Sequence, residues 1–173
     1  PVGRSQGFEG QGLQGIAGKY RRGRVECDMY GRFAAAQGMA QLAGERELQG
    51  ELAVDRARVL VLLRREAEAV AILTEARNLA PANPQAWLLS ATLARRQNRL
   101  PEAQVQIERA AELLPIDPEI GLEAGVIAVL AGRDDAARKS WQSVLAMAPE
   151  SSFAQLAQAY LDQLGPQAPP VER

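Results

Sequence analysis

"AWLLSATLARRQNRLPEAQVQIERAAELLP", residues 86–115, holds two helix-like stretches separated by "RRQNRLPEA". A tryptophan stands near its start, at Trp87, and a proline closes it, at Pro115. Proline recurs at the same interval on either side of that position, at Pro81 and Pro149. A recurring interval of this length, about 34 residues, predicts an array of similar helical hairpins that stack on one another.

The same interval separates residues of matched size. Two helices approach closely only where side chains are small, so Ala91 and Ala103 are expected to face each other. Trp87 and Ile107 are then expected to fill the volume between neighbouring hairpins. The proline pairs in "PANP" and "PIDP" end one hairpin and open the next. The matched sets are Ala69, Ala103 and Ala137; Ala57, Ala91 and Gly125; Leu73, Ile107 and Trp141; and Leu79, Leu113 and Met147.

This pattern resembles the tetratricopeptide repeat, whose signature is W-x₂-L-G-x₂-Y, then A-x₃-F, then P, over about 34 residues. The departures are Ser90, where leucine is usual, and Ala94, where tyrosine is usual. The resemblance covers about residues 50–151 and implies an all-α protein, a right-handed α-solenoid of helix-turn-helix hairpins with a C-terminal capping helix. The matching residues of the middle unit are Trp87, Ala91, Ala103, Ile107 and Pro115.

The repeat divides the chain into segments. Three units are expected at residues 50–83, 84–117 and 118–151. A capping helix is expected at 152–164, with Ser152 as its cap, because apolar residues form one stripe there. Residues 165–173 are expected to form a tail, residues 1–18 an irregular glycine-rich segment, and residues 19–49 a degenerate hairpin whose second helix is "MYGRFAAAQGMAQLAG". The apolar stripe comprises Phe153, Leu156, Ala157, Tyr160, Leu161 and Leu164.

Composition excludes several kinds of function. The chain has 47% hydrophobic and 24% charged residues and a net charge of −1, which does not favour binding to nucleic acid or to anionic lipid. It contains no histidine, which removes imidazole-based catalysis and imidazole metal sites. No apolar run approaches the length needed to span a bilayer. No leader is evident, although the chain begins "PVGRSQ" without Met. Neither a cofactor nor an enzymatic activity is therefore expected.

Four features could still carry chemistry, and each also has a structural explanation. Cys27 is either a reactive thiol or a small apolar residue. Asp134 and Asp135 either bind a cation or cap a helix in the turn "GRDDAARK". The basic stretch "KYRRGR", residues 19–24, either touches phosphates or lies on a solvated helix face. The two tryptophans, Trp87 and Trp141, are either stacking platforms or core residues, and their repeat positions favour the core.

The resemblance places partner binding on the inner, concave face, which the first helix of each hairpin builds. An apolar floor of Leu88, Leu89, Leu122 and Val126 suits an amphipathic helix. No lysine or asparagine occurs among the inward positions, which argues against a carboxylate clamp. The inward positions are Glu51, Val54 and Leu62, together with the predicted partner-binding residues Asp55, Arg58, Gln85, Leu88, Leu89, Thr92, Arg96, Glu119, Leu122, Glu123 and Val126.

The predicted function is a protein-interaction scaffold that binds a peptide or helix of a partner protein. The alternative is a self-association module, a homo-oligomer whose groove is filled by its own segment or by another copy. "AARKSWQSVLAMAPESSFAQLAQAYLDQL" is also similar to the end of bacterial tetratricopeptide proteins of the cytochrome c maturation type. That likeness favours a bacterial envelope assembly and leaves the location open between the periplasm or envelope and the cytoplasm.

Overall fold

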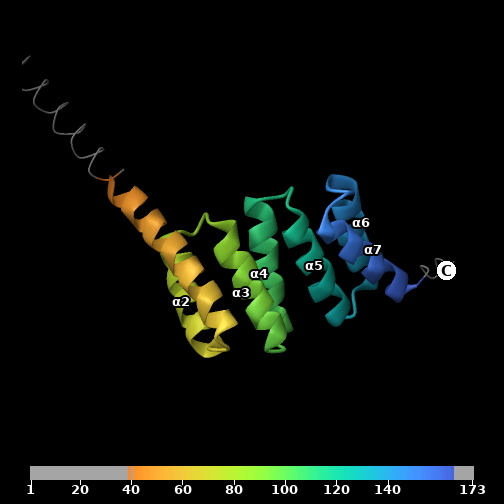
Figure 1. The fold of residues 1–173 in the computed structure, drawn as a ribbon, viewed down its shortest axis with the longest axis horizontal. Helices are drawn as coiled ribbons and strands as arrows, with labels where there is room; N and C mark the ends of the chain where they lie inside the picture. Colours follow the sequence, from red (N-terminus) through yellow and green to blue (C-terminus); the bar gives the residue numbers. More distant parts are fainter. Residues whose placement is uncertain (1–38, 40, 166–173) are drawn as a thin grey trace, which may run out of the picture. The chain divides into compact units, whose positions relative to one another are not determined.

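The computed structural model describes residue 39 and residues 41–165, and the chain divides into two compact units, residues 1–45 and 46–173. The described residues contain helices and turns but no strand, which confirms the all-α prediction (Figure 1). A first helix covers residues 41–62. It is followed by α2 (Glu66–Leu79), α3 (Pro84–Arg96), α4 (Leu100–Leu113), α5 (Pro118–Leu130), α6 (Asp134–Met147) and α7 (Ser152–Leu164).

The helices form a stacked array in which each contacts its neighbours along the chain. Among α2–α7, the closest packing is between α3 and α4 and between α5 and α6, the hairpins of the middle and last predicted units. The helix over residues 41–62 is continuous, so the predicted segment boundary between residues 49 and 50 falls inside a helix. The rest of the predicted segment 19–49, the segment 1–18 and the tail beyond residue 165 lie outside the described residues.

The small residues of the repeat lie where helices approach most closely. Ala91 and Ala103 are fully buried and pack in one cluster with Ile107. The tightest contact among the described glycines is at Gly125, where an added Cβ atom would lie 2.1 Å from Nε1 of Trp141. Trp141 itself is buried, as predicted, and its Nε1 donates a hydrogen bond of 3.1 Å to the Leu122 carbonyl. The size pattern in the sequence therefore reflects the contact surfaces between helices.

Trp87 lies at the edge of the core rather than inside it. Its indole is half-buried and donates a hydrogen bond of 2.9 Å to the Pro81 carbonyl. The guanidinium of Arg77 lies 5.3 Å from the ring centroid and also donates to Oγ of Ser90. Ser90 is buried and donates a hydrogen bond of 2.6 Å to the Ala86 carbonyl. Serine therefore replaces the usual leucine where an arginine enters the gap between α2 and α3.

The turn inside each hairpin contains one residue in the left-handed backbone region. These residues are Arg64, Asn98 and Gly132, with φ of 62°, 58° and 70°. They are spaced by the repeat interval, so the three turns share one geometry. Only glycine adopts this region without a steric cost, and asparagine tolerates it better than arginine does.

Helix starts differ between the two helices of a hairpin. Asn83, Asp117 and Ser151 cap α3, α5 and α7 by accepting hydrogen bonds from backbone N–H groups of the first turn. Ser151 is therefore the cap, and the prediction of Ser152 was wrong by one residue. No side chain caps α2, α4 or α6. Asp134 and Asp135 lie in the first turn of α6, so they do not cap it, contrary to prediction, although carboxylates there favour the helix dipole.

Candidate protein-interaction surface

The first helix of each hairpin lies on the inner side of the array. Backbone contacts connect α3 with α5 and α5 with α7, each pair being one repeat apart. The second helices α2, α4 and α6, all fully described, do not approach one another in this way. An array whose first helices are closer together than its second helices curves toward the first helices. The surface formed by α3, α5 and α7 is therefore the inner surface, and α7 takes the place of a first helix in it.

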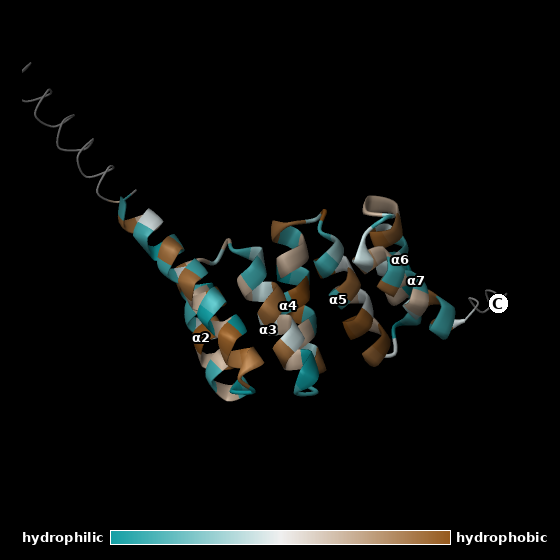
Figure 2. Ribbon diagram, viewed as in Figure 1, coloured by the Kyte–Doolittle hydropathy of each residue, from teal (hydrophilic) through white to brown (hydrophobic). Residues whose placement is uncertain are grey.

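The inner surface changes from charged to apolar along the array. Three positions show the change. Each position recurs in α3, α5 and α7 at the repeat interval. In α3 they are Thr92, Arg95 and Arg96; in α5 they are Val126, Val129 and Leu130; and in α7 they are Tyr160, Gln163 and Leu164. Figure 2 shows the apolar character of α5 over most of its length.

Ion pairs and hydrogen bonds join neighbouring helices in the charged part. Arg58 contacts both Asp55 and Gln85 at 2.9 Å, which links the helix over residues 41–62 to α3. Arg96 pairs with Glu66 of α2 at 2.6 Å. Five predicted inward residues therefore lie in polar networks, namely Asp55, Arg58, Gln85, Arg96 and Glu123.

The pair between Arg95 and Glu123 is the best shielded of these contacts. Its side chains are only 23% and 13% exposed, and the two contacts measure 2.6 and 3.2 Å. It connects α3 to α5 across the inner surface. A half-buried, bidentate pair holds its geometry better than an exposed one. Arg95 was not among the predicted site residues.

Glu119, a predicted site residue, stands at the start of α5. Desolvation raises the pKa of its carboxyl group, Asp117 and Glu123 raise it further, and Arg58 opposes them. Three acidic side chains therefore share one region at the junction of α3 and α5.

The predicted apolar floor is only partly accessible. Leu88 is only 4% exposed and packs with Ile107, Ile120 and Ile127, so the prediction that it faces solvent was wrong. Val54 is buried in the same way against α2 and α3. The reason is that contact between successive first helices covers these positions. Leu89, Thr92, Leu122 and Val126 are half-buried and retain partly accessible surface.

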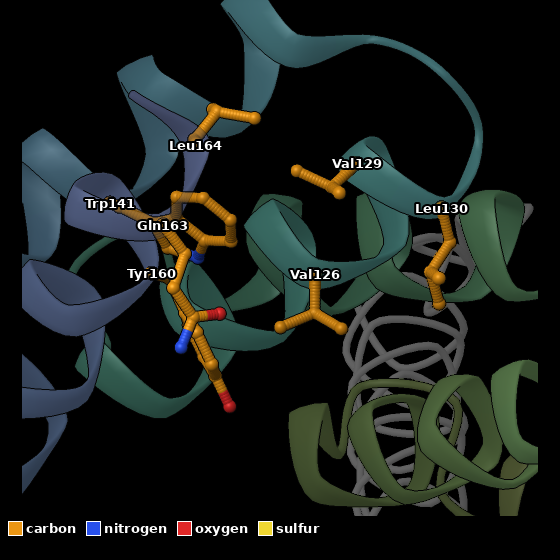
Figure 3. Close-up of a pocket in the computed structure, with 7 residues that line it drawn as sticks. All are labelled: Val126, Val129, Leu130, Trp141, Tyr160, Gln163 and Leu164. Carbon is orange, nitrogen blue, oxygen red and sulfur yellow. The ribbon is translucent and has the colours of Figure 1, made fainter. Parts of the chain in front are cut away.

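An apolar pocket of about 380 Å³ lies between α5 and α7 (Figure 3). Trp141 of α6 lies at its base and packs on Tyr160, with ring centroids 5.3 Å apart. Leu130 is 53% exposed, and its side chain lies at the edge of the pocket. Polar character comes from Tyr160 and Gln163. The lining residues are Val126, Val129, Leu130, Trp141, Tyr160, Gln163 and Leu164.

Only Val126 of this pocket was among the predicted site residues. Trp141, Tyr160 and Leu164 were assigned to the core or to the capping stripe, and Val129, Leu130 and Gln163 were missed. The repeat interval contained the missing signal, because one repeat step from Arg95 and Arg96 reaches Val129 and Leu130. One more step reaches Gln163 and Leu164. The predicted capping helix, α7, stands where the first helix of a further unit would lie.

The described residues offer no site for a metal ion. No group of three or more histidine, cysteine, aspartate or glutamate side chains with suitable placement occurs among them. Cys27 and the basic stretch 19–24 lie outside the described residues. None of the helices in the described part of the chain has the length and apolar content needed to cross a bilayer. The inner surface and its pocket are the best-defined candidate site.

No protein-family model matches the sequence, and no curated protein matches it significantly. Solved structures do resemble it. The tetratricopeptide domain of Arabidopsis OM64 is 18% identical, with a TM-score of 0.63, covering 68% of this chain and 98% of that chain. The first tetratricopeptide domain of Spaghetti (RPAP3), bound to the HSP90 peptide SRMEEVD, is 17% identical, with a TM-score of 0.60, covering 66% and 94%.

A third structure is YrrB, described as a tetratricopeptide protein with an unusual peptide-binding site. It is 22% identical, with a TM-score of 0.58, and the match covers 64% of this chain and 57% of that one. At these identities the similarities show that the chain has the tetratricopeptide-repeat fold. The narrower likeness to proteins of the cytochrome c maturation type stays a prediction.

Proposed function

We propose that this chain is a protein-interaction scaffold that binds a peptide or helix of a partner protein along its inner surface. The pocket between α5 and α7 carries the proposal. It is concave and mostly apolar, and its few polar groups can orient a ligand. A large apolar side chain of the partner would enter it and supply most of the affinity.

The charged part of the inner surface favours a partner that binds through an apolar side chain over a partner that binds through a carboxylate. Arg58, Arg95 and Arg96 each already contact a carboxylate of the same chain. A partner's terminal carboxylate would have to displace those contacts, which costs affinity. The RPAP3 domain is bound to a peptide and YrrB has a peptide-binding site, and both similarities support peptide binding as the class of function.

The partner-binding residues of this proposal combine the pocket with the accessible predicted residues. Leu89, Thr92, Leu122 and Val126 would extend the apolar contact, and Leu88 would support it from the core. Asp55, Arg58, Gln85, Arg96, Glu119 and Glu123 would set orientation through polar contacts.

The proposed setting is a bacterial envelope assembly. The preference for arginine, with Lys19 and Lys139 as the only lysines, favours a bacterial source. The C-terminal likeness described above favours the envelope.

A phage-displayed peptide library tests the proposal. Wild-type protein is expected to enrich peptides that share a large apolar residue. Leu130→Glu should abolish that enrichment while the melting temperature stays near the wild-type value, because Leu130 is already 53% exposed. Ile116→Glu, at a loop position that is 77% exposed, is the matched control and should enrich the same peptides. Unchanged enrichment by Leu130→Glu would place binding elsewhere.

A further inference from the structure

The helix over residues 41–62 carries an apolar stripe on the side away from the core. Leu48, Leu52, Val59 and Leu63 are 57%, 60%, 54% and 59% exposed, and Leu63 continues the helix with a 3.0 Å backbone hydrogen bond to Val59. Steps of 4, 7 and 4 residues place all four side chains within roughly 60° of one another around the helix axis. Val54, Ala57 and Leu60 occupy the opposite side and pack against α2 and α3.

The other end of the array does not match this stripe. The outward side of α7 presents Gln155, Gln158 and Asp162, all exposed, and Gln158 donates a 2.8 Å hydrogen bond to Asp162. Leu156 is its only exposed large apolar residue among those described. Stacking of one copy's first helix on another copy's α7 would therefore bury polar groups against leucine. Head-to-tail growth of the array is disfavoured.

The stripe is instead complementary to itself. Its spacing of 4, 7 and 4 reads the same in both directions along the helix. In an antiparallel pair of these helices, Leu48 would therefore face Leu63 of the second copy, and Leu52 would face Val59. Such a pair obeys two-fold symmetry and is closed, because each stripe is covered by the other copy's stripe. We infer that this stripe is the interface of a symmetric homodimer, with a second copy of this chain as its occupant.

The charges on one flank of the stripe are compatible with this arrangement. Asp55 is the charged residue closest to the two-fold axis on one flank, and it would approach Asp55 of the second copy. Its charge is already compensated, because Arg58 holds its carboxylate at 2.9 Å. By symmetry, Asp55 of the second copy has the same arginine partner, so each aspartate keeps its own Arg58 in the dimer. The like charges are therefore screened by two arginines.

The interface is short. Four residues of each copy span about 22 Å of helix, and the face they form is smaller than the roughly 800 Å² per partner of a standard stable interface. The dimer is therefore weak, and its population depends on protein concentration.

Sedimentation velocity of the full chain over a concentration series tests the inference. The mass should rise from 18.7 kDa toward twice that value as concentration increases. Leu52→Glu combined with Val59→Glu should stay at the monomer mass at every concentration, with an unchanged melting temperature. Val105→Glu is the matched control, because Val105 is a 64% exposed valine on α4, and it should dimerise like the wild type.

Disulfide cross-linking tests the antiparallel register. In a Cys27→Ser background, a chain carrying Leu48→Cys is mixed with a chain carrying Leu63→Cys and oxidised. The mixture should form a covalent dimer, whereas each chain alone should not. Cross-linking of Leu48→Cys with itself would overturn the antiparallel arrangement.

Two further outcomes would overturn the inference altogether. One is a wild-type chain that remains monomeric while the double glutamate variant melts lower, which would mean that the chain's own residues cover the stripe. The other is a monomeric wild-type chain with no change in melting, which would leave the stripe to a different protein. The inference does not rest on the proposed function, because the two can fail separately. Leu130→Glu should abolish peptide capture and leave the dimer mass unchanged. The double glutamate variant of the stripe should abolish the dimer and leave peptide capture unchanged.

Discussion

At the scale of single residues, the contact between Gly125 and Trp141 limits what the helix pair can accept. Gly125→Ala would bring a methyl group against a buried indole, whose Nε1 is fixed by a hydrogen bond to the Leu122 carbonyl. We expect a loss of about 1–3 kcal/mol in the free energy of unfolding, measured in urea. The clash therefore outweighs the roughly 1 kcal/mol by which alanine favours a helix over glycine, and the expected loss is the net change.

Gly44→Ala is the matched control, because Gly44 is also helical and a Cβ atom there would meet nothing within 4 Å. The same substitution should stabilise the protein by about 0.4–1 kcal/mol. If Gly125→Ala were stabilising as well, the indole would not be held in place as described.

Glu119 gives a pH-dependent prediction. Its pKa is raised in the folded protein, so the folded state binds this proton more tightly than the unfolded chain does. Stability from this group is fully present below the ordinary glutamate value of about 4.3 and is lost as the pH rises through the folded value. Glu119→Gln should therefore melt at a higher temperature than the wild type at neutral pH. The two melting temperatures should converge below about pH 4, and a constant difference across the series would contradict the assigned cause.

At the scale of the structural element, the three hairpin turns share one backbone geometry but not one residue. The backbone of Arg64 adopts the left-handed region although the residue carries a side chain, whereas Gly132 adopts the same region without one. Arg64→Gly should therefore raise the free energy of unfolding by about 0.5–1 kcal/mol, since relief of strain exceeds the added entropy of the unfolded chain. Gly132→Ala should lower it by a similar amount. Thermal and urea unfolding of both variants check the opposite signs.

The repeat was predictable at this scale because packing imposes residue size at fixed intervals. The positions of Ala103, Trp141 and the helix ends at the prolines follow from spacing alone. Leu88 was misplaced because its burial depends on contact between successive first helices, which the pattern of a single hairpin does not contain. The continuous helix through residue 49 was not predicted either, because the repeat interval placed a unit boundary at residue 50.

The pocket was the least predictable feature. It exists only because α7 packs beside α5 and leaves a gap above Trp141, and the gap depends on the shapes of Leu130 and Leu164 together. Sequence spacing can place such residues in one row. It cannot show whether the space between them is filled.

At the scale of the whole molecule, α7 protects the end of the array. Trp141, Val144 and Ala157 form one buried cluster, and Tyr160 and Leu161 pack against it from α7. Removal of residues 152–173 would expose the apolar side of α5 and α6. Because each unit of such an array is stabilised by its neighbours, we expect a lower melting temperature and binding of an apolar dye. Removal of residues 166–173 alone is the control and should leave both measurements unchanged.

The two tryptophans differ in their surroundings, and that difference gives the array two optical reporters. Trp87 of α3 is half-buried and lies under the guanidinium of Arg77, whereas Trp141 of α6 is only 3% exposed. An indole in an apolar environment fluoresces at shorter wavelength than one in contact with water and charge. With either tryptophan replaced by phenylalanine, the emission of the other would follow the loosening of its own hairpin. Two unfolding curves that separate would show which end of the array opens first, and coincident curves would show that the hairpins open together.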